Sequence, residues 1–242
     1  MAKKVNRLVD LFLYVLSCGW SYYPFMARPV LLFDCDGVLS DFSKKCLEIV
    51  KELTGEEFSR EDVVDTFHFE YLLRETCMES SMPIVRDIID HRINTPEFCM
   101  SLAPVAGARG VLDRLRDIAD VYVVTTLPYR TFEWAPHRVR WLEEHMNVSR
   151  DDVIFTKKKY LVQGDVFVDD MQANVEAWAR AHPRGMGVLW SQNSGQVAAP
   201  FKSDNIVELR DWNKLIPMII RHIESHTKTL INAIDSRRHN RV

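Results

Sequence analysis

Four short apolar segments of this 242-residue chain end in polar residues whose types suit chemistry on a phosphate ester. The side chains are carboxylates, hydroxyls and an amine: Asp34 and Asp36, Thr125 and Thr126, Lys159, and Asp169 and Asp170. A carboxylate can attack phosphorus as a nucleophile, while hydroxyl and ammonium groups stabilise the charge that develops on the transferred group. Together, the four segments indicate phosphoryl transfer.

The first segment, LLFDCDGVL, carries the residues for a covalent step. Asp34 can attack the phosphorus atom and form an aspartyl-phosphate. Asp36 can protonate the leaving alkoxide and then deprotonate the attacking water. Gly37 lets the backbone turn sharply toward the phosphate. Because the carboxylates and the phosphate repel one another, a hard divalent cation is expected between them, and magnesium fits this role.

Each of these sequence signals, taken alone, often has a purely structural explanation. A D-x-D-G sequence occurs in turns and calcium loops, and a Thr-Thr pair after a strand often forms a turn or a helix cap. A run of lysines is usually a solvated face, and two consecutive aspartates often cap a helix. What favours a shared site is that all four signals occur in order, each at the end of a predicted strand.

The elements that must position these residues alternate along the chain. The predicted strands cover 29–35, 121–125, 153–156, 166–168, 187–190 and 206–209, and the predicted helices cover 109–118, 133–145, 171–181 and 212–226. This alternation predicts a Rossmann-like α/β fold with a central parallel sheet covered by helices on both faces. Ligands of such sheets bind beyond the carboxyl ends of the strands, where the polar residues lie.

One helical block interrupts the alternation and divides the chain. Residues 43–102 are predicted to form a small helical cap, inserted after the first strand into a core domain of residues 26–42 and 103–226. Residues 227–242 form a basic polar tail that we expect to be mobile. Residues 1–25 are an N-terminal extension whose role the sequence does not define, and its apolar stretch is too short to span a bilayer.

Composition limits the partners and the compartment. The net charge of −3 argues against binding of a nucleic acid polymer, so an anionic substrate must meet local positive charge. The five cysteines are scattered without metal-ligand spacing, which predicts free thiols in a reducing, cytoplasmic compartment. The extension is interpreted as an appended amphipathic segment; the alternatives are a secretion signal, whose apolar region Asp10 interrupts, and a natural start at Met26.

With these residues in view, the chain resembles the haloacid-dehalogenase phosphatases. It is most similar to the 5′(3′)-deoxyribonucleotidase family, the cytosolic and mitochondrial pyrimidine nucleotidases. The similarity covers most of residues 26–220 and is carried by MARPVLLFDCDGVLSDF, VVTTLP, HRVRWLEEHM, VIFTKKKYLVQGDVFVDD and RDWNKLI. The resemblance implies magnesium-dependent hydrolysis of nucleoside monophosphates such as 5′(3′)-deoxyribonucleotides, and it is compatible with a homodimer.

The resemblance also implies roles for the acidic residues. Asp34 corresponds to the nucleophile and Asp36 to the acid/base, whose backbone carbonyl also binds magnesium. Asp170 corresponds to a direct metal ligand and Asp169 to its acidic neighbour. These four residues are therefore the candidate metal ligands.

Further matched residues would contact the substrate. Thr125 and Thr126 correspond to a phosphate-binding step, and Lys159 to a lysine ten residues before the acidic pair. The selection of Lys159 from the run 157–159 rests on spacing alone. Phe42 corresponds to an aromatic residue beside the nucleobase.

The similarity is loose in the predicted cap. Phe67, His68 and Phe69 map onto the aromatic residues that enclose the nucleobase. Alternatively, Phe67, Phe69, Tyr71 and Phe98 form the core of the cap itself, which spacing alone slightly favours. Because stacking on an aromatic ring suits any base, neither a base nor a sugar preference follows.

Three hypotheses about function result. The first is a phosphatase for nucleoside monophosphates, and the second is a phosphatase for another small phosphate ester, such as a phosphosugar. The third is a non-catalytic binding module with the same fold. Retention of Asp34, Asp36, a lysine and the acidic pair argues against the third, because a binding module needs no acid/base carboxylate.

Overall fold

A six-stranded, all-parallel sheet forms the centre of the computed structural model, which describes residues 28–55, 57, 87, 91–127, 133–191 and 200–239. Its strand order is β3-β2-β1-β4-β5-β6. The strands are β1 (Val30–Phe33), β2 (Asp120–Thr125), β3 (Val153–Phe155), β4 (Val166–Asp169), β5 (Met186–Trp190) and β6 (Ile206–Leu209). The parallel sheet confirms the predicted α/β class, and each strand lies where the sequence predicted one.

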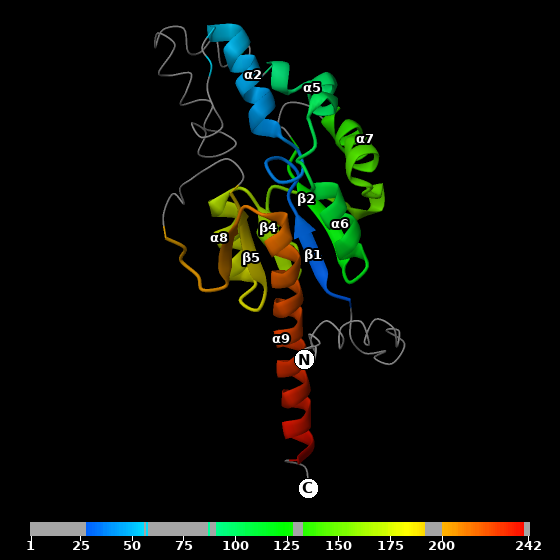
Figure 1. Ribbon diagram of the computed structural model, residues 1–242, viewed down its shortest axis with the longest axis vertical. Helices are drawn as coiled ribbons and strands as arrows, with labels where there is room; N and C mark the ends of the chain where they lie inside the picture. The colour runs from blue at the N-terminus through cyan, green and yellow to red at the C-terminus, as the bar shows by residue number, and fades with distance from the viewer. Residues whose placement is uncertain are drawn as a thin grey trace, which may run out of the picture.

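Helices cover the sheet and extend beyond it at both ends (Figure 1). They are α2 (Phe42–Thr54), α5 (Pro96–Ser101), α6 (Ala108–Arg116), α7 (Trp134–Met146), α8 (Gln172–Ala181) and α9 (Trp212–His239). α5 and all of α2 except Phe42 belong to the segment expected to form the cap, and the two helices lie together at one end of the molecule. The boundaries of the cap stay a prediction, because most of residues 56–90 lie outside the described residues, as does the extension 1–25.

Helix α9 is longer than the sequence predicted. It continues to His239 instead of ending near residue 226, so most of the segment expected to be a mobile tail is helical. Residues 227–239 contain no glycine or proline, the residues that most strongly end helices. In Figure 1 the C-terminal part of α9 projects away from the sheet, at the end opposite α2.

The chain order reverses beside the central strand. β1 pairs with β2 on one side and with β4 on the other. At such a position the loops after the two neighbouring strands diverge, and a crevice opens beyond their carboxyl ends. The residues that follow β1 and β4 therefore lie on either side of the expected ligand site.

Alternate strand residues pack on opposite faces of the sheet. Leu31 and Phe33 join the large core cluster, whereas Leu32 packs with Phe167 and Trp178 on the other face. β4 and β5 are buried along their whole length, as expected for parallel strands covered on both faces. This burial fixes the strand ends, and with them the positions of the polar residues that follow.

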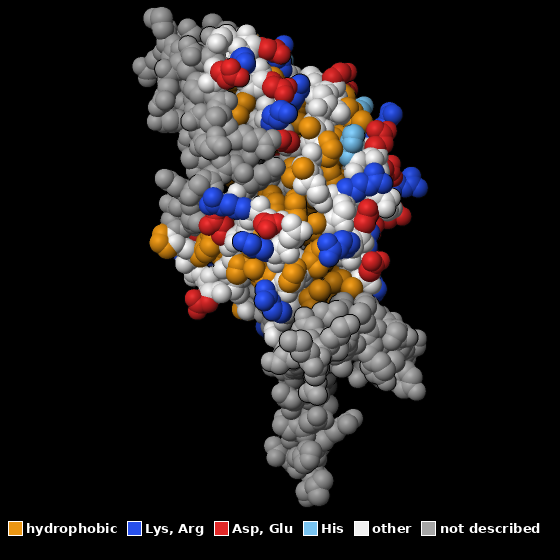
Figure 2. Space-filling view, in the orientation of Figure 1, with side chains coloured by type: hydrophobic (Ala, Val, Ile, Leu, Met, Phe, Trp, Pro, Cys, Tyr) orange, Lys and Arg blue, Asp and Glu red, His pale blue; other side chains and the backbone are white. Residues whose placement is uncertain are grey.

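The structure describes both the surface charges and the cysteines on which the sequence-based expectations rested. Acidic and basic side chains are interspersed on the face shown in Figure 2. Within the described residues, Cys35, Cys46 and Cys99 are buried free thiols. Over the same residues, every helix is too short or too polar to cross a bilayer.

Candidate active site

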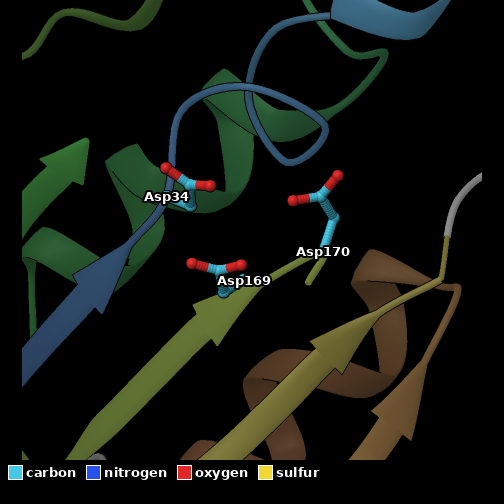
Figure 3. A group of neighbouring side chains, drawn as sticks. All are labelled: Asp34, Asp169 and Asp170. Carbon is cyan, nitrogen blue, oxygen red and sulfur yellow. The ribbon is translucent and has the colours of Figure 1, made fainter. Parts of the chain in front are cut away.

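Three carboxylates meet at the carboxyl ends of β1 and β4 (Figure 3). Asp34 directly follows β1, and its N–H donates to the Val168 carbonyl at 2.8 Å, which ties it to β4. Asp169 is the last residue of β4 and Asp170 follows it. One oxygen from each of the three carboxylates lies within 4.8 Å of the other two. Two segments far apart in the sequence thus build one acidic cluster.

The turn after β1 brings the backbone against this cluster. The Cys35 carbonyl accepts hydrogen bonds from the N–H groups of Leu39 and Ser40 at 2.7 and 2.8 Å, which closes the turn. Gly37 has a φ of +79°, a conformation that side-chain-bearing residues rarely adopt. A Cβ at this position would lie 2.0 Å from Asp170 Oδ2. Glycine is therefore required here both for its conformation and for the close approach to Asp170.

Lys159 joins the two strand ends from the third side. Its Nζ lies 2.7 Å from Asp34 Oδ1 and 2.8 Å from Asp169 Oδ2, and the side chain is only 5% exposed. Burial opposes the charge of the ammonium group, but the adjacent Asp169 and Asp34 carboxylates outweigh it and raise the pKa of Lys159 above its ordinary value. Lys157 and Lys158 are exposed, so Lys159 is the lysine of the run that enters the site.

The Asp34 carboxylate is in an environment that disfavours its charge. Burial is the main effect; Lys159 opposes it, Asp169 adds to it, and the pKa of Asp34 rises to about 7. Its Oδ1 accepts a hydrogen bond from the Cys35 N–H at 2.7 Å in addition to the contact with Lys159. A cation placed among the three carboxylates would relieve this unfavourable environment.

The two aspartates at the end of β4 differ in their surroundings. Asp169 is completely buried, and it accepts hydrogen bonds from the Met171 N–H, the Asn174 amide and Lys159. Asp170 is only partly buried, and in Figure 3 its side chain points toward the turn that follows β1. Asp169 is thus held by neighbouring protein groups, whereas Asp170 is the more accessible of the two carboxylates.

The threonine pair follows β2 at the same edge of the sheet. Thr125 is buried two residues beyond Val123, which pairs with Phe33 of β1. The Thr126 hydroxyl donates to the Thr156 carbonyl at 3.2 Å and so links the ends of β2 and β3. Thr126 therefore has a structural partner that sequence reasoning did not include.

Asp36 stands apart from the three clustered carboxylates because other groups hold it. Ser40 Oγ donates to its Oδ1 at 2.6 Å, and one terminal nitrogen of Arg138 contacts Oδ1 at 2.7 Å and Oδ2 at 2.8 Å. Arg138 lies in the segment HRVRWLEEHM but was not predicted to be a site residue. The available signal was an arginine between Trp134 and Trp141, at helical spacing on an otherwise apolar face.

The aromatic residues near the site pack against one another. Phe42 is buried and meets Phe98 edge-on with ring centroids 5.5 Å apart, and Phe98 stacks on Trp134. Phe98 belongs to the large core cluster that also contains residues of the sheet, and a separate core of the cap stays a prediction. Phe67, His68, Phe69 and Tyr71 lie outside the described residues.

Comparison with known proteins identifies the family of this chain. Residues 28–215 match the sequence model of the family described as "5′ nucleotidase, deoxy (Pyrimidine), cytosolic type C protein". The cytosolic type 5′(3′)-deoxyribonucleotidase of Homo sapiens is 28% identical over 149 residues, which cover 60% of this chain and 72% of that protein.

Solved structures share the fold. A haloacid dehalogenase-like hydrolase from Streptococcus pneumoniae superposes with a TM-score of 0.53 and 10% identity, over 79% of this chain and 98% of that one. YfnB, a haloacid dehalogenase-type protein from Bacillus subtilis solved with bound magnesium, gives a TM-score of 0.52 and 15% identity, over 80% of this chain and 99% of that one. The predicted haloacid-dehalogenase fold is therefore confirmed.

Proposed function

Because this chain belongs to the cytosolic type C family of 5′-deoxyribonucleotidases, it is a nucleotidase, a phosphoric monoester hydrolase, and we propose that it hydrolyses 5′(3′)-deoxyribonucleotides through an aspartyl-phosphate. The observation that carries this proposal is the convergence of Asp34, Lys159 and Asp170 at the carboxyl ends of β1 and β4. A carboxylate nucleophile, the ammonium group of a lysine and a further carboxylate therefore lie close together beyond the sheet. This is the arrangement needed to hold and attack a phosphate.

The residues divide the reaction into two displacements. An Asp34 oxygen attacks phosphorus, the P–O bond to the nucleoside breaks, and Asp36 gives its proton to the departing alkoxide. Asp36 then takes a proton from water as the water attacks the aspartyl-phosphate, which restores Asp34 and releases phosphate. Lys159, already paired with Asp34, stabilises the charge on the transferred group.

The acidic cluster fits a hard divalent cation, and we propose magnesium. Its donors are carboxylate oxygens within 4.8 Å of one another, the ligand type that magnesium prefers. Asp34 and Asp170 would hold the ion, with the Asp36 carbonyl as the further ligand that the family resemblance implies, while the contacts of Asp169 orient Lys159. When bound, magnesium supplies positive charge between the carboxylates and the phosphate.

We also propose a cytoplasmic location. Buried free thiols at Cys35, Cys46 and Cys99 suit a reducing compartment. The name of the human relative, a cytosolic type enzyme, supports the same assignment.

A turnover panel tests the substrate assignment. Purified protein with magnesium would be given dUMP, dTMP, the matching 3′-monophosphates and a set of sugar phosphates, with Asp34→Asn as the inactive control. We expect kcat/KM for the deoxyribonucleotides to exceed that for every sugar phosphate by at least about tenfold, because recognition of the nucleoside adds binding in the transition state. A tenfold preference for sugar phosphates would replace the nucleotide assignment, and binding without turnover would support the non-catalytic module.

A further inference from the structure

Arg138 is a buried charge that the reaction outlined above does not use. Its side chain is 1% exposed, and its terminal nitrogen contacts both oxygens of Asp36, at 2.7 and 2.8 Å. The second terminal nitrogen donates to Cys35 Sγ at 3.0 Å. A guanidinium so deep in the protein is stable only with a charged partner, and Asp36 provides it. The ion pair therefore fixes the arginine and the carboxylate together.

Two tryptophans hold the guanidinium in place. Its central carbon lies 4.8 Å from the centroid of Trp134 and 5.8 Å from that of Trp141, within the range of cation–π attraction. Trp134 Nε1 donates to the Thr95 carbonyl at 2.7 Å, and Trp141 Nε1 donates to the Leu102 carbonyl at 2.9 Å. The rings are thus anchored to the segment that holds α5. Arg138 has little freedom to leave Asp36.

The ion pair between Arg138 and Asp36 is not needed to shape the turn that carries Asp36. The Cys35 carbonyl already closes this turn through bonds from Leu39 and Ser40. Within the described residues, moreover, Nε of Arg138 is buried without a hydrogen-bond partner, which costs stability. An apolar side chain at position 138 would avoid this cost. A role in stability alone does not explain the arginine.

We propose that Arg138 is a positioning residue that orients the Asp36 carboxylate for proton transfer, an inference that rests on the proposed function. Among the described residues, Oδ1 of Asp36 accepts from both Ser40 and Arg138, whereas Oδ2 accepts from Arg138 alone. Oδ1 is therefore the oxygen held by two residues, and Oδ2, held by Arg138 alone, is the oxygen placed to exchange a proton with the leaving group. As the P–O bond breaks, the proton on Oδ2 passes to the alkoxide, while Oδ1 stays bound to Ser40 and Arg138.

The test compares two leaving groups. A nucleoside alkoxide needs a proton as it departs, whereas the p-nitrophenolate from p-nitrophenyl phosphate is stable as an anion and does not. The value of kcat/KM reports the steps up to the first irreversible one, here departure of the leaving group. For Arg138→Met we expect kcat/KM with dUMP to fall about 100-fold, as for loss of an acid catalyst, and kcat/KM with p-nitrophenyl phosphate to fall less than about fivefold. Arg138→Lys, which keeps the charge but loses the planar fork, should lie between wild type and Arg138→Met.

Controls separate positioning from damage to the fold. Arg140→Met changes an exposed arginine of the same helix, which pairs with Glu144, and should leave both substrates unaffected. In an Asp36→Asn background, Arg138→Met should cause no further loss with dUMP, because the carboxylate it orients is already gone. If Arg138→Met unfolds the chain, Arg138→Lys carries the same comparison.

The possible results are distinct. Equal losses with both substrates, or no loss with dUMP, would overturn the role of Arg138 while leaving the nucleotidase intact. Wild-type protein that hydrolyses p-nitrophenyl phosphate but no nucleotide would instead overturn the proposed substrate. Additive losses in the double variant would show that Arg138 acts independently of Asp36.

Discussion

Gly37 stands directly against Asp170: a Cβ added to Gly37 would lie 2.0 Å from the Oδ2 atom of that carboxylate. The turn that follows the nucleophile therefore contacts the strand end that carries Asp170 through a residue without a side chain. This contact couples two loops that are 133 positions apart in the chain, as the numbers of the two residues show. It explains why D-x-D must be followed by glycine in this site, beyond the general preference of turns.

Gly37→Ala should damage the site more than the fold. The left-handed conformation costs an alanine about 1–2 kcal/mol, and the clash must in addition displace Asp170. We expect at least about 100-fold loss of kcat and weaker magnesium binding, measured by steady-state kinetics and calorimetry. Gly55→Ala is the matched control, since Gly55 has a φ of +76° but nothing within 4 Å of its Cβ. Similar losses of activity in both variants would contradict the importance of the Asp170 contact.

Asp34→Asn should abolish turnover and stabilise the metal-free protein at neutral pH. Burial raises the pKa of Asp34 to about 7 from its ordinary value of 3.8, so the folded state binds this proton more tightly than the unfolded chain. The contribution of protonated Asp34 to the free energy of unfolding is then fully present below about pH 4 and is lost as the pH rises from about 4 to 7. At pH 8 the asparagine variant should be more stable by about 1–4 kcal/mol, because one pKa unit corresponds to about 1.4 kcal/mol.

Urea unfolding in EDTA at pH 5 and pH 8 measures this difference. The advantage of Asp34→Asn should be larger at pH 8. A variant that is less stable than wild type at pH 8 would show that the pair with Lys159 outweighs the burial of the Asp34 charge.

Asp169 and Asp170 should separate structure from metal binding. Asp170→Asn should keep the fold and weaken magnesium affinity, because its carboxylate belongs to the acidic cluster and is only partly buried. Asp169→Asn removes a buried charge partner of Lys159 and should lower the free energy of unfolding by about 3–5 kcal/mol. Magnesium titration and urea unfolding of both variants test this division, and the reverse pattern would exchange the two roles.

In wild type, EDTA should remove activity and magnesium should restore it.

Lys159→Met should reduce kcat by about 100- to 1,000-fold, the effect of losing one stabilising group at a developing charge. Lys158→Met is the control, since Lys158 is the preceding residue in the chain and is exposed. Steady-state kinetics with dUMP give the comparison. Equal kcat values for the two variants would remove Lys159 from the proposed reaction.

The sequence by itself determined the framework of the site. Buried parallel strands read as short apolar runs, and their carboxyl ends share one edge of the sheet, so the positions of Asp34, Thr125 and Asp170 followed from the pattern. The spacing of the lysine run also selected Lys159, the lysine that enters the site. The proposed cap aromatics Phe67, His68 and Phe69 lie outside the described residues and stay a prediction.

Only the tertiary structure decided which polar side chains hold one another. The contact of one Arg138 nitrogen with both oxygens of Asp36 joins residues 102 positions apart, and the link from Thr126 to Thr156 crosses between strands. The same is true of the difference between Asp169, which is completely buried and accepts hydrogen bonds from three residues, and Asp170, which is only partly buried. Hydrophobic periodicity reports which face of an element is buried, but the partner of a buried charge is set by how separate elements pack, and that information is not local to any segment.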